Sequence, residues 1–490
     1  MLFGGLALGL RSIGITAPWG ADNFGTAGAF FSIAARNYAR YGYLATHLLP
    51  VVTAEGPPSP PVYYLHHPPL LELLVSASFA LFGVHEWAAR LVPLAFSVAS
   101  LGLLVHLATR FYGERVALLT LVIAATLPLE NHLAMHVDVQ GSVLLALVLA
   151  TVTCLAHQRY SAAVAFFTLG AAVDWPALYL PILLAVAPWP FEFPRPRRFV
   201  AGLLLYSAIV FLALSSWLSG PSTVLVLLHE RALSFRSDTG VPFGLVEWLH
   251  TVVGWYLWHL CTPAVLVALV IWLVWRVPVL LRAPHPERLT LLLLLFGLTH
   301  MIVGFQGAYQ HEFWATYLRA GVPLACALVL EQMAAAVPQD WRRTLVVGAG
   351  LGIIVVPGLV GTLRLAARPL SARMLDADYT PSELAEAIRS CTPAGTGAFT
   401  SDYYGESATF FYADRPLAIS VVTVDALAQL LRRPRYDPPG GSGDPYEGPA
   451  TPTCFVMPRL HERYFPQLAA HLRARYIGTV HGRFETFPLH

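Results

Sequence analysis

The chain has 490 residues, of which 56% are hydrophobic and only 12% are charged, about half the charged fraction of an average soluble domain. All 31 basic residues are arginine and the formal net charge is +2, which excludes a strongly basic surface of the kind that binds nucleic acid. The five cysteines lack the spacing of a zinc or iron–sulfur site. This composition indicates an integral membrane protein.

Apolar runs of about 20 residues, the length that crosses the hydrocarbon core, recur along the first three quarters of the chain. The predicted membrane helices are 2–17, 88–109, 114–130, 139–156, 199–219, 251–275, 289–305, 313–336 and 344–364. The run 161–190 is interrupted at Asp174-Trp175-Pro176 and is predicted to form a hairpin of two short helices, 161–173 and 176–190. Segments 26–43 and 68–83 are predicted to lie along the outer membrane surface.

Arginine placement orients these helices, because cytoplasmic loops are enriched in basic residues. The arginines assigned to the cytoplasmic side are Arg110, Arg115, Arg159, Arg195, Arg197, Arg198, Arg276, Arg282, Arg288, Arg342 and Arg343. One threading of about eleven spans satisfies all of them, with the N-terminus in the cytoplasm and the C-terminus outside. It requires that 68–83 does not cross, since a crossing would separate Asp22 from Asp138.

The composition changes after Arg368, where short β-like runs alternate with helical patterns. The predicted strands are 398–401, 418–422, 453–457 and 483–487, and the predicted helices are 381–390, 424–433 and 462–475. We therefore expect a helical membrane domain over 1–365 and a small extracytoplasmic α/β domain over 376–490. Cys391 and Cys454 could pair in an exported domain, and the sequence leaves this open.

Two isolated acids on the outer side are the candidate catalytic residues. Asp22 follows the first apolar run and could act as a general base, or it could cap the helix that begins near residue 26. Asp138 precedes helix 139–156, where the same two interpretations apply. Together the two carboxylates could also hold a divalent ion such as Mg²⁺ or Mn²⁺, which is the only cofactor that the sequence suggests.

Histidines and arginines in the outer loops are candidate ligands for a phosphate, because imidazole and guanidinium groups donate hydrogen bonds to anions. They are His66, His67, Arg231, Arg236 and Arg319. Arg319 lies inside an apolar helix, where an uncompensated charge is costly, so it requires an anionic partner: either a lipid phosphate or a nearby carboxylate. The other residues of the predicted substrate pocket are His136, Tyr309, His311, Glu312 and Tyr317.

Several of these stretches resemble the GT-C superfamily of membrane glycosyltransferases, in the branch that contains lipid A aminoarabinose transferases and protein O-mannosyltransferases. The resemblance rests on Asp22 with the helix Phe30-Phe31-Ser32-Ile33-Ala34-Ala35-Arg36-Asn37, on His67-Pro68-Pro69-Leu70, on Phe82-Gly83 with Glu86 and Arg90-Leu91, and on Gln310-His311-Glu312-Phe313 with Tyr317 and Pro323. It covers roughly residues 1–365. The C-terminal part is similar only in kind.

The resemblance implies a polyprenyl-phosphate-linked sugar donor, transfer on the extracytoplasmic face, Asp22 as the catalytic base and Asp138 as a second acid that helps bind metal or acceptor. Two residues depart from the family pattern. Asn23 stands where the mannosyltransferase branch has a second acid, and His67 stands where the aminoarabinose-transferase branch has a lysine. The second departure leaves the mode of phosphate binding open.

The leading hypothesis is therefore an inverting glycosyltransferase of the inner (plasma) membrane, with a lipid donor, surrounding membrane lipids and an unidentified acceptor as partners. A transporter or lipid flippase is the alternative. It would place polar groups on both sides of a pathway, often in repeated halves, and no internal repeat is visible. A non-catalytic membrane subunit is a third hypothesis.

Overall fold

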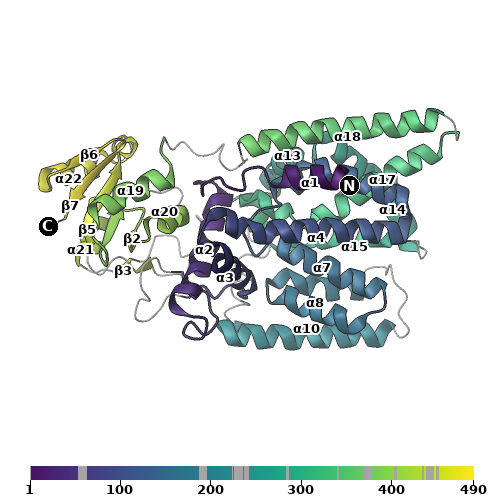
Figure 1. Ribbon diagram of the computed structural model, residues 1–490, viewed down its shortest axis with the longest axis horizontal. Coiled ribbons are helices and arrows are strands. Elements are labelled where there is room, and N and C mark those ends of the chain that lie inside the picture. The colour runs from purple at the N-terminus through teal and green to yellow at the C-terminus, as the bar shows by residue number, and fades with distance from the viewer. Residues whose placement is uncertain are drawn as a thin grey trace.

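The computed structural model comprises a helical bundle at one end and a smaller domain with a β-sheet at the other (Figure 1). It describes residues 2–52, 63–186, 196–222, 225, 235–236, 242–282, 286–338, 341–368, 370, 378–401, 406–432, 435–436, 446–447 and 452–489.

The bundle is built from apolar helices that run roughly parallel or antiparallel (Figure 1). They are α1 (Leu2–Arg11), α4 (Glu86–Tyr112), α5 (Glu114–Thr126), α7 (Ser142–Ala156), α8 (Tyr160–Ala171), α9 (Tyr179–Val186), α10 (Pro196–Leu218), α14 (Pro263–Arg282), α15 (Arg288–Val303), α17 (Leu318–Ala335) and α18 (Trp341–Ala367). Among the described residues, α4, α10, α14, α17 and α18 are long and apolar enough to cross a membrane. The protein is thus an integral, multi-pass membrane protein, as its composition predicts.

The structure corrects two of the predicted spans. The first helix stops at Arg11 instead of residue 17, and its 10 residues cover only about 15 Å. The predicted helix 251–275 is two helices: a π-helical segment, η2 (His250–Leu257), runs into α13 (Trp258–Cys261), and α14 starts anew at Pro263. The break has a local cause, because a residue before proline is disfavoured in the α conformation, and Thr262 adopts a φ of 67°.

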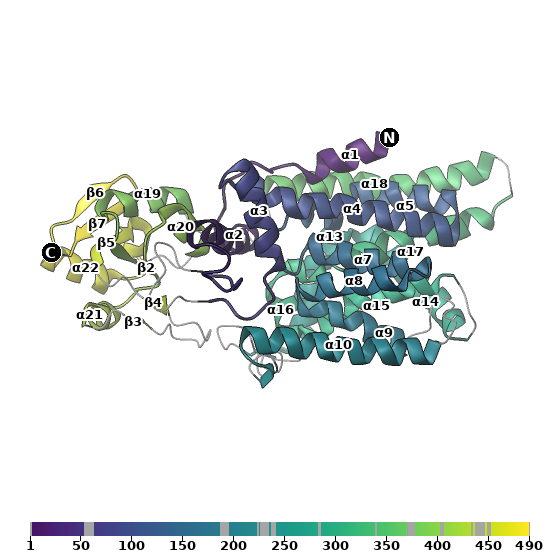
Figure 2. The ribbon, with the colours of Figure 1, turned by 60° about the horizontal axis from the view of Figure 1, so that its bottom comes forward.

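The two predicted surface helices are present as α2 (Asn23–Tyr41) and α3 (Leu70–Phe82). Both lie between the bundle and the smaller domain (Figures 1 and 2). With 13 residues, α3 measures only about 20 Å, which is too short to cross the hydrocarbon core. Short helices at the same end of the bundle are α6 (Pro128–His132), η1 (Trp175–Leu178), α12 (Leu245–Leu249), α16 (Phe305–Gln310) and η3 (Glu312–Ala315).

Arginines predicted to be cytoplasmic meet at the opposite end of the bundle. Arg110, at the far end of α4, donates to the carbonyl of Ala156 at 2.9 Å. Arg115 and Arg343 both pair with Glu331, each at 2.9 Å. The basic loops and the candidate site loops therefore lie at opposite ends of the helices, as a single threading requires.

The smaller domain contains a five-stranded sheet in the order β2-β1-β5-β7-β6. The strands are β1 (Gly397–Thr400), β2 (Leu417–Ala418), β5 (Pro452–Pro458), β6 (Thr479–His481) and β7 (Phe484–Pro488). Strands β2, β1 and β5 are parallel, whereas β7 and β6 are antiparallel to their neighbours. Helices α19 (Pro381–Cys391), α20 (Glu406–Ala413), α21 (Val424–Arg432) and α22 (Pro466–Arg475) surround it, and β3 (Arg435–Tyr436) pairs with β4 (Tyr446–Glu447).

Apolar side chains cover both faces of this sheet. Leu384 and Ile388 of α19 pack with Val456 on one face. On the other face, Leu427 of α21 and Leu472 of α22 pack with Phe455. A disulfide joins Cys391 at the end of α19 to Cys454 in β5. Four of the strands overlap the runs for which the sequence predicts β structure, where short β-like runs alternate with helical patterns.

Candidate functional site

Loops that are far apart in the sequence converge where the bundle meets α2 and α3. They are the segments before α2, before α3, between α6 and α7, around η1, and from α16 to the start of α17. Three hydrogen bonds join four of these segments in two pairs: Asn23 Nδ2 to Glu312 Oε2 at 3.1 Å, and Trp175 Nε1 to the His66 carbonyl at 2.8 Å together with Leu70 N to the Ala172 carbonyl at 3.1 Å. His136, between α6 and α7, contacts the rings of Phe24 and Phe313. The predicted convergence of the candidate residues on one end of the bundle is therefore observed for the described part of the chain.

Asp22 is the N-cap of α2 and also lines a pocket. Its Oδ1 accepts the backbone N–H groups of Phe24 at 2.9 Å and Gly25 at 3.0 Å, so the capping interpretation of Asp22 is correct. The carboxylate also faces a pocket of about 170 Å³ that is lined by Arg90 and His136, among others. Since the cap uses Oδ1, the second oxygen remains for chemistry, and the two interpretations of Asp22 do not exclude each other.

Aromatic and imidazole rings form one wall of this pocket. The ring of Phe24 lies 4.5 Å from the rings of both His132 and His136, and His136 lies 4.6 Å from Phe313. Burial, together with the nearby His132 and His311, lowers the pKa of His136 to about 3, so this imidazole is neutral. Glu312, which accepts from Asn23, is also buried. The segment Gln310-His311-Glu312-Phe313 thus contacts the start of α2 directly.

His67 belongs to a second, neighbouring cluster. Its Nδ1 lies 2.7 Å from Oδ1 of Asp174, which also caps η1 by accepting the N–H of Trp175 at 2.7 Å. Asp174 is fully buried. The two prolines after His67 restrict the backbone of its segment. The imidazole itself is held by Asp174, at the interruption of the predicted hairpin.

Asp138 lies in this second cluster, with Glu72 and Tyr317. The charges of His67 and Asp174 act on Asp138, and those of Asp138 and Asp174 act on Glu72 and Tyr317. Burial raises the pKa of Asp138 to about 7 and that of Glu72 to about 8. Both carboxylate oxygens of Glu72 and the hydroxyl of Tyr317 are buried without a hydrogen-bond partner in the described chain. Such polar atoms are costly to bury unless something pairs with them.

Sequence reasoning missed one member of this cluster, His300, and it noted Glu72 only as one of the polar residues on the outer side, without a role. Glu72 is the single acid of α3 and faces inward. His300 lies near the end of α15 with 1% of its surface exposed, stacks on Trp314 at 4.3 Å and is an electrostatic neighbour of His67. A histidine isolated in an apolar helix is the signal that could have identified His300.

Replacement of Asp138 by asparagine is expected to stabilise the ligand-free protein increasingly as the pH rises. The folded-state pKa, about 7, exceeds the ordinary value of 3.8, so folding is penalised as the pH rises above 3.8, and the penalty is complete above pH 7. Asparagine is neutral throughout and still accepts the Gln140 N–H, which is 2.8 Å from Asp138 Oδ1.

Thermal unfolding in detergent at pH 4, 6 and 8 measures this effect. The difference in melting temperature between Asp138→Asn and the parent should be near zero at pH 4 and largest at pH 8. The same substitution at Asp425, an exposed residue of α21, should give a flat difference. A stabilisation that shrinks with rising pH would contradict the assignment.

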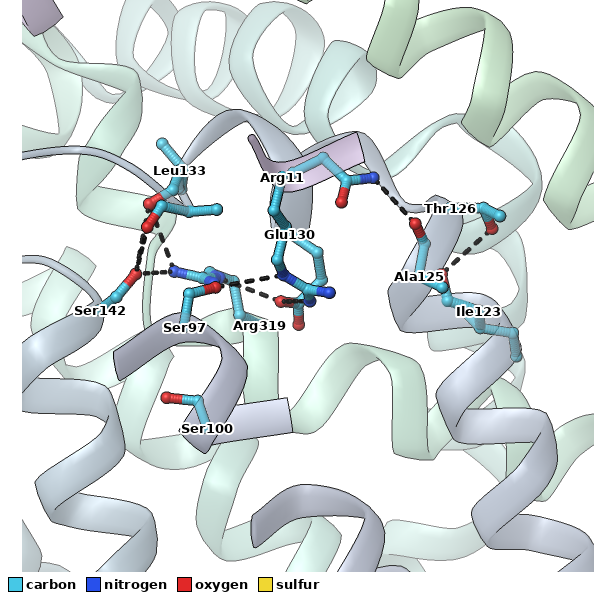
Figure 3. Close-up of polar contacts among 12 residues, drawn as sticks. Arg11, Ser97, Ser100, Ile123, Ala125, Thr126, Glu130, Leu133, Ser142 and Arg319 are labelled. Carbon is cyan, nitrogen blue, oxygen red and sulfur yellow. Dashed lines mark hydrogen bonds and ion pairs between the residues drawn. The ribbon is translucent and has the colours of Figure 1, made fainter. Parts of the chain in front are cut away.

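Arg319 lies apart from both clusters, at the centre of a buried ion-pair network (Figure 3). Its Nε is 3.2 Å from Glu130 Oε2, which also pairs with Arg11 at 2.8 Å. The other guanidinium nitrogens of Arg319 donate to Ser142 Oγ at 2.8 Å and Ser97 Oγ at 2.6 Å. The sequence allowed either a lipid phosphate or a nearby carboxylate as the anionic partner of Arg319, and the structure shows the carboxylate of Glu130. Arg319 is therefore not part of the candidate phosphate site.

The remaining predicted residues lie in several places. Arg236 is exposed and forms an isolated β-bridge with Pro242, and Arg231 lies outside the described residues. Tyr309 stacks on Phe243 with ring centres 4.0 Å apart. Within the described residues, no three His, Cys, Asp or Glu side chains are grouped so as to hold a metal ion.

Comparison with known proteins places this geometry in context. The sequence profile of a family described as dolichyl-phosphate-mannose-protein mannosyltransferase matches residues 66–219, a segment that starts at the His66-His67 pair. No curated protein sequence matches the chain significantly. Crystal structures of ArnT from Cupriavidus metallidurans are similar at 15% identity, with TM-scores of 0.57 in the apo state and 0.60 bound to undecaprenyl phosphate, each covering 99% of this chain and 97% of ArnT.

The chain shares the fold of ArnT. An oligosaccharyltransferase from Archaeoglobus fulgidus is similar as well, with a TM-score of 0.57 and 11% identity, over 97% of this chain and 72% of that protein. The resemblance to the branch of aminoarabinose and O-mannosyl transferases, predicted from degenerate motifs, is therefore confirmed. The similarity to ArnT extends through the smaller domain, where the sequence alone indicated only similarity in kind.

Proposed function

We propose that the protein is an inverting glycosyltransferase that moves a sugar from a polyprenyl-phosphate-linked donor to an acceptor on the extracytoplasmic face. The observation that carries this proposal is the junction of two polar clusters at one end of an apolar bundle: the Asp22 pocket and the buried group around His67, Asp138 and Asp174. A related fold, ArnT, binds undecaprenyl phosphate. A lipid phosphate is a chemically suitable leaving group because it departs as a stable anion.

In the proposed mechanism, Asp22 takes the proton from the acceptor hydroxyl as the acceptor oxygen attacks the anomeric carbon. The bond from that carbon to the phosphate oxygen breaks in the same step, which inverts the configuration. His66 and His67 would donate hydrogen bonds to the departing phosphate, with Arg231 and Arg236 as the remaining cationic candidates. Asp138, with Glu72 and Tyr317, would bind sugar hydroxyls, since the buried polar atoms of Glu72 and Tyr317 have unmet hydrogen-bonding capacity.

Asp22 and Asp138 were also candidates for a shared Mg²⁺ or Mn²⁺ ion. Asp138 has His67 and Asp174 as its charged neighbours, whereas Asp22 faces the pocket that contains Arg90. This arrangement does not favour a common ion. The proposed mechanism therefore uses no metal ion.

We propose the inner membrane as the location, with the β-sheet domain outside. The arginines at the far end of the bundle support this orientation through the positive-inside rule. The disulfide between Cys391 and Cys454 supports it independently, since disulfides persist in oxidising compartments. In this arrangement residues 1–365 form the transferase domain and residues 376–490 the extracytoplasmic domain.

A transporter or flippase is not favoured. The clusters described above lie at one end of the bundle, whereas alternating access requires a substrate site reachable from both sides. The matching sequence family and the similar Archaeoglobus fulgidus structure are also transferases by name.

Binding of undecaprenyl phosphate to the purified protein tests the proposal. We expect saturable, stoichiometric binding in native mass spectrometry, and competition by other polyprenyl phosphates but not by a polyprenol that lacks the phosphate. Incubation with a panel of polyprenyl-phosphate sugars should then release free polyprenyl phosphate from at least one donor. Equal binding of polyprenol and polyprenyl phosphate would overturn the proposed donor class.

A further inference from the structure

A side chain of the β-sheet domain reaches the loop that carries Asp22. The hydroxyl of Tyr412, in α20, accepts the backbone N–H of Trp19 at 2.6 Å and donates to Glu86 Oε1 at 2.6 Å. These contacts join residues 393 and 326 positions apart. Trp19 lies three residues before Asp22, and Glu86 is the first residue of α4. One phenol thus connects three elements: the catalytic loop, the bundle and the extracytoplasmic domain.

The Trp19 side chain is enclosed from three directions. The guanidinium of Arg90 lies over its ring at 4.1 Å, and the ring of Phe411 approaches edge-on at 6.5 Å. On the third side is Gly28 of α2, where a β-carbon would come within 2.3 Å of the indole. Only 2% of Trp19 is exposed, so the residue is fixed in place when α20 is docked.

The backbone before Trp19 is held from the same helix that binds Tyr412. Arg90, one turn after Glu86 in α4, donates to the carbonyl of Ile15 at 2.9 Å and to that of Ala17. Beyond Trp19, Gly20 approaches Gly25 so closely that a β-carbon on Gly25 would lie 2.1 Å from the Gly20 carbonyl oxygen. The loop therefore has little freedom on either side of the Trp19 N–H.

Ion pairs hold α20 against α2. Asp414, directly after α20, pairs with Arg36 at 2.9 Å and with Arg40 at 2.7 Å. Arg36 also donates to the Phe411 carbonyl at 3.0 Å, and its guanidinium lies 5.4 Å from the Phe411 ring. These contacts between α2 and the end of α20 hold Tyr412 beside the loop.

We propose that Tyr412 is a positioning residue for Asp22, so that the extracytoplasmic domain completes the catalytic site. The proposal rests on the proposed function, because it assigns Tyr412 a role in presenting the base. Loss of the hydroxyl leaves the Trp19 N–H and the Glu86 carboxylate without a shared partner, while the ring can still pack beside Phe411. Asp22 would keep its cap on α2, but the loop before it would move more freely.

The variant Tyr412→Phe tests this, with Tyr464→Phe as the matched control. Tyr464 lies in the same domain, and 58% of it is exposed. Ala21→Cys provides a reporter in the loop: its rate of labelling by a membrane-impermeant maleimide reads loop opening without reference to catalysis. The parent chain, with free Cys154, Cys261 and Cys326, gives the background.

We expect Tyr412→Phe to raise the labelling rate of Ala21→Cys about tenfold, because one neutral and one charge-assisted hydrogen bond are lost, and Tyr464→Phe to leave it unchanged. Turnover with a lipid-linked donor should fall about tenfold in Tyr412→Phe, with the Michaelis constant for the donor unchanged. Glu86→Gln, which keeps a carbonyl acceptor for the phenol, should retain most of the parent's protection.

An unchanged labelling rate in folded Tyr412→Phe would overturn the proposal. Faster labelling of Ala21→Cys in Tyr412→Phe, in a protein whose parent reacts with no lipid-linked donor, would support the role of Tyr412 in holding the loop. The same result would count against the proposed function. Size-exclusion profiles that match the parent would show that the variant remains folded.

Discussion

Replacement of Asp22 by asparagine is expected to reduce sugar transfer by about 10²–10⁴-fold, the contribution typical of general acid–base catalysis. Folding should be retained, because asparagine is as good an N-cap as aspartate and its carbonyl oxygen can accept the same N–H groups of Phe24 and Gly25. The measurement is initial transfer rate from a lipid-linked donor, together with melting temperature.

Two companion variants separate the cap of α2 from the chemistry. Asp22→Ser keeps a capping oxygen and removes the carboxylate, so it should resemble Asp22→Asn. Asp22→Ala removes both and should also destabilise the protein, by about 0.5–2 kcal/mol. Near-parental activity in Asp22→Asn would exclude Asp22 as the base and leave it only the cap.

Replacement of Glu130 by glutamine is expected to produce the largest loss of stability. Glu130 is the carboxylate between Arg11 and Arg319, and all three side chains are buried. Its neutralisation leaves two guanidinium groups buried without a counter-charge, which costs about 3–5 kcal/mol when one partner of a buried pair is removed. We expect a lower melting temperature in detergent and a reduced yield of folded protein.

Glu331 offers a matched control, because it too bridges two arginines, Arg115 and Arg343. Its side chain is 26% exposed, against 6% for Glu130. Surface pairs contribute about 0–1 kcal/mol, so Glu331→Gln should be nearly neutral. Addition of Arg11→Met to Glu130→Gln should recover part of the loss. Equal stability of the two glutamine variants would refute a structural role for the buried network.

The helical framework could be predicted because hydrophobicity and arginine placement are local properties. Runs of apolar residues gave the bundle helices, and the shortness of 68–83 gave a surface helix in place of a span. The prediction failed at Thr262-Pro263, where backbone conformation interrupts an otherwise uniform apolar run. It also failed at Arg11, where the first helix ends early.

Several residues of the candidate site were predicted from the sequence, but the contacts that group them into two clusters were not. Asp22, His67 and Asp138 were singled out because charges are rare in this chain. The sequence suggested one site for Asp22, His67 and Asp138, but it did not reveal that Asp174 joins His67 and Asp138, since His67 and Asp174 are 107 residues apart. Arg319 was correctly expected to have an anionic partner, and only the ion pair between α17 and α6 showed that the partner is Glu130.

The sequence alone determined that this is a membrane protein with its rare charges at the ends of apolar helices, because burying unpaired charge in a bilayer is prohibitively costly. Only the tertiary structure decided which of those charges meet. It separated the Arg11–Glu130–Arg319 network from the open pocket and brought Tyr412 to the loop of Asp22. The reason is physical: hydrophobic burial follows composition segment by segment, whereas a hydrogen bond or ion pair depends on the positions of two side chains that distant segments supply.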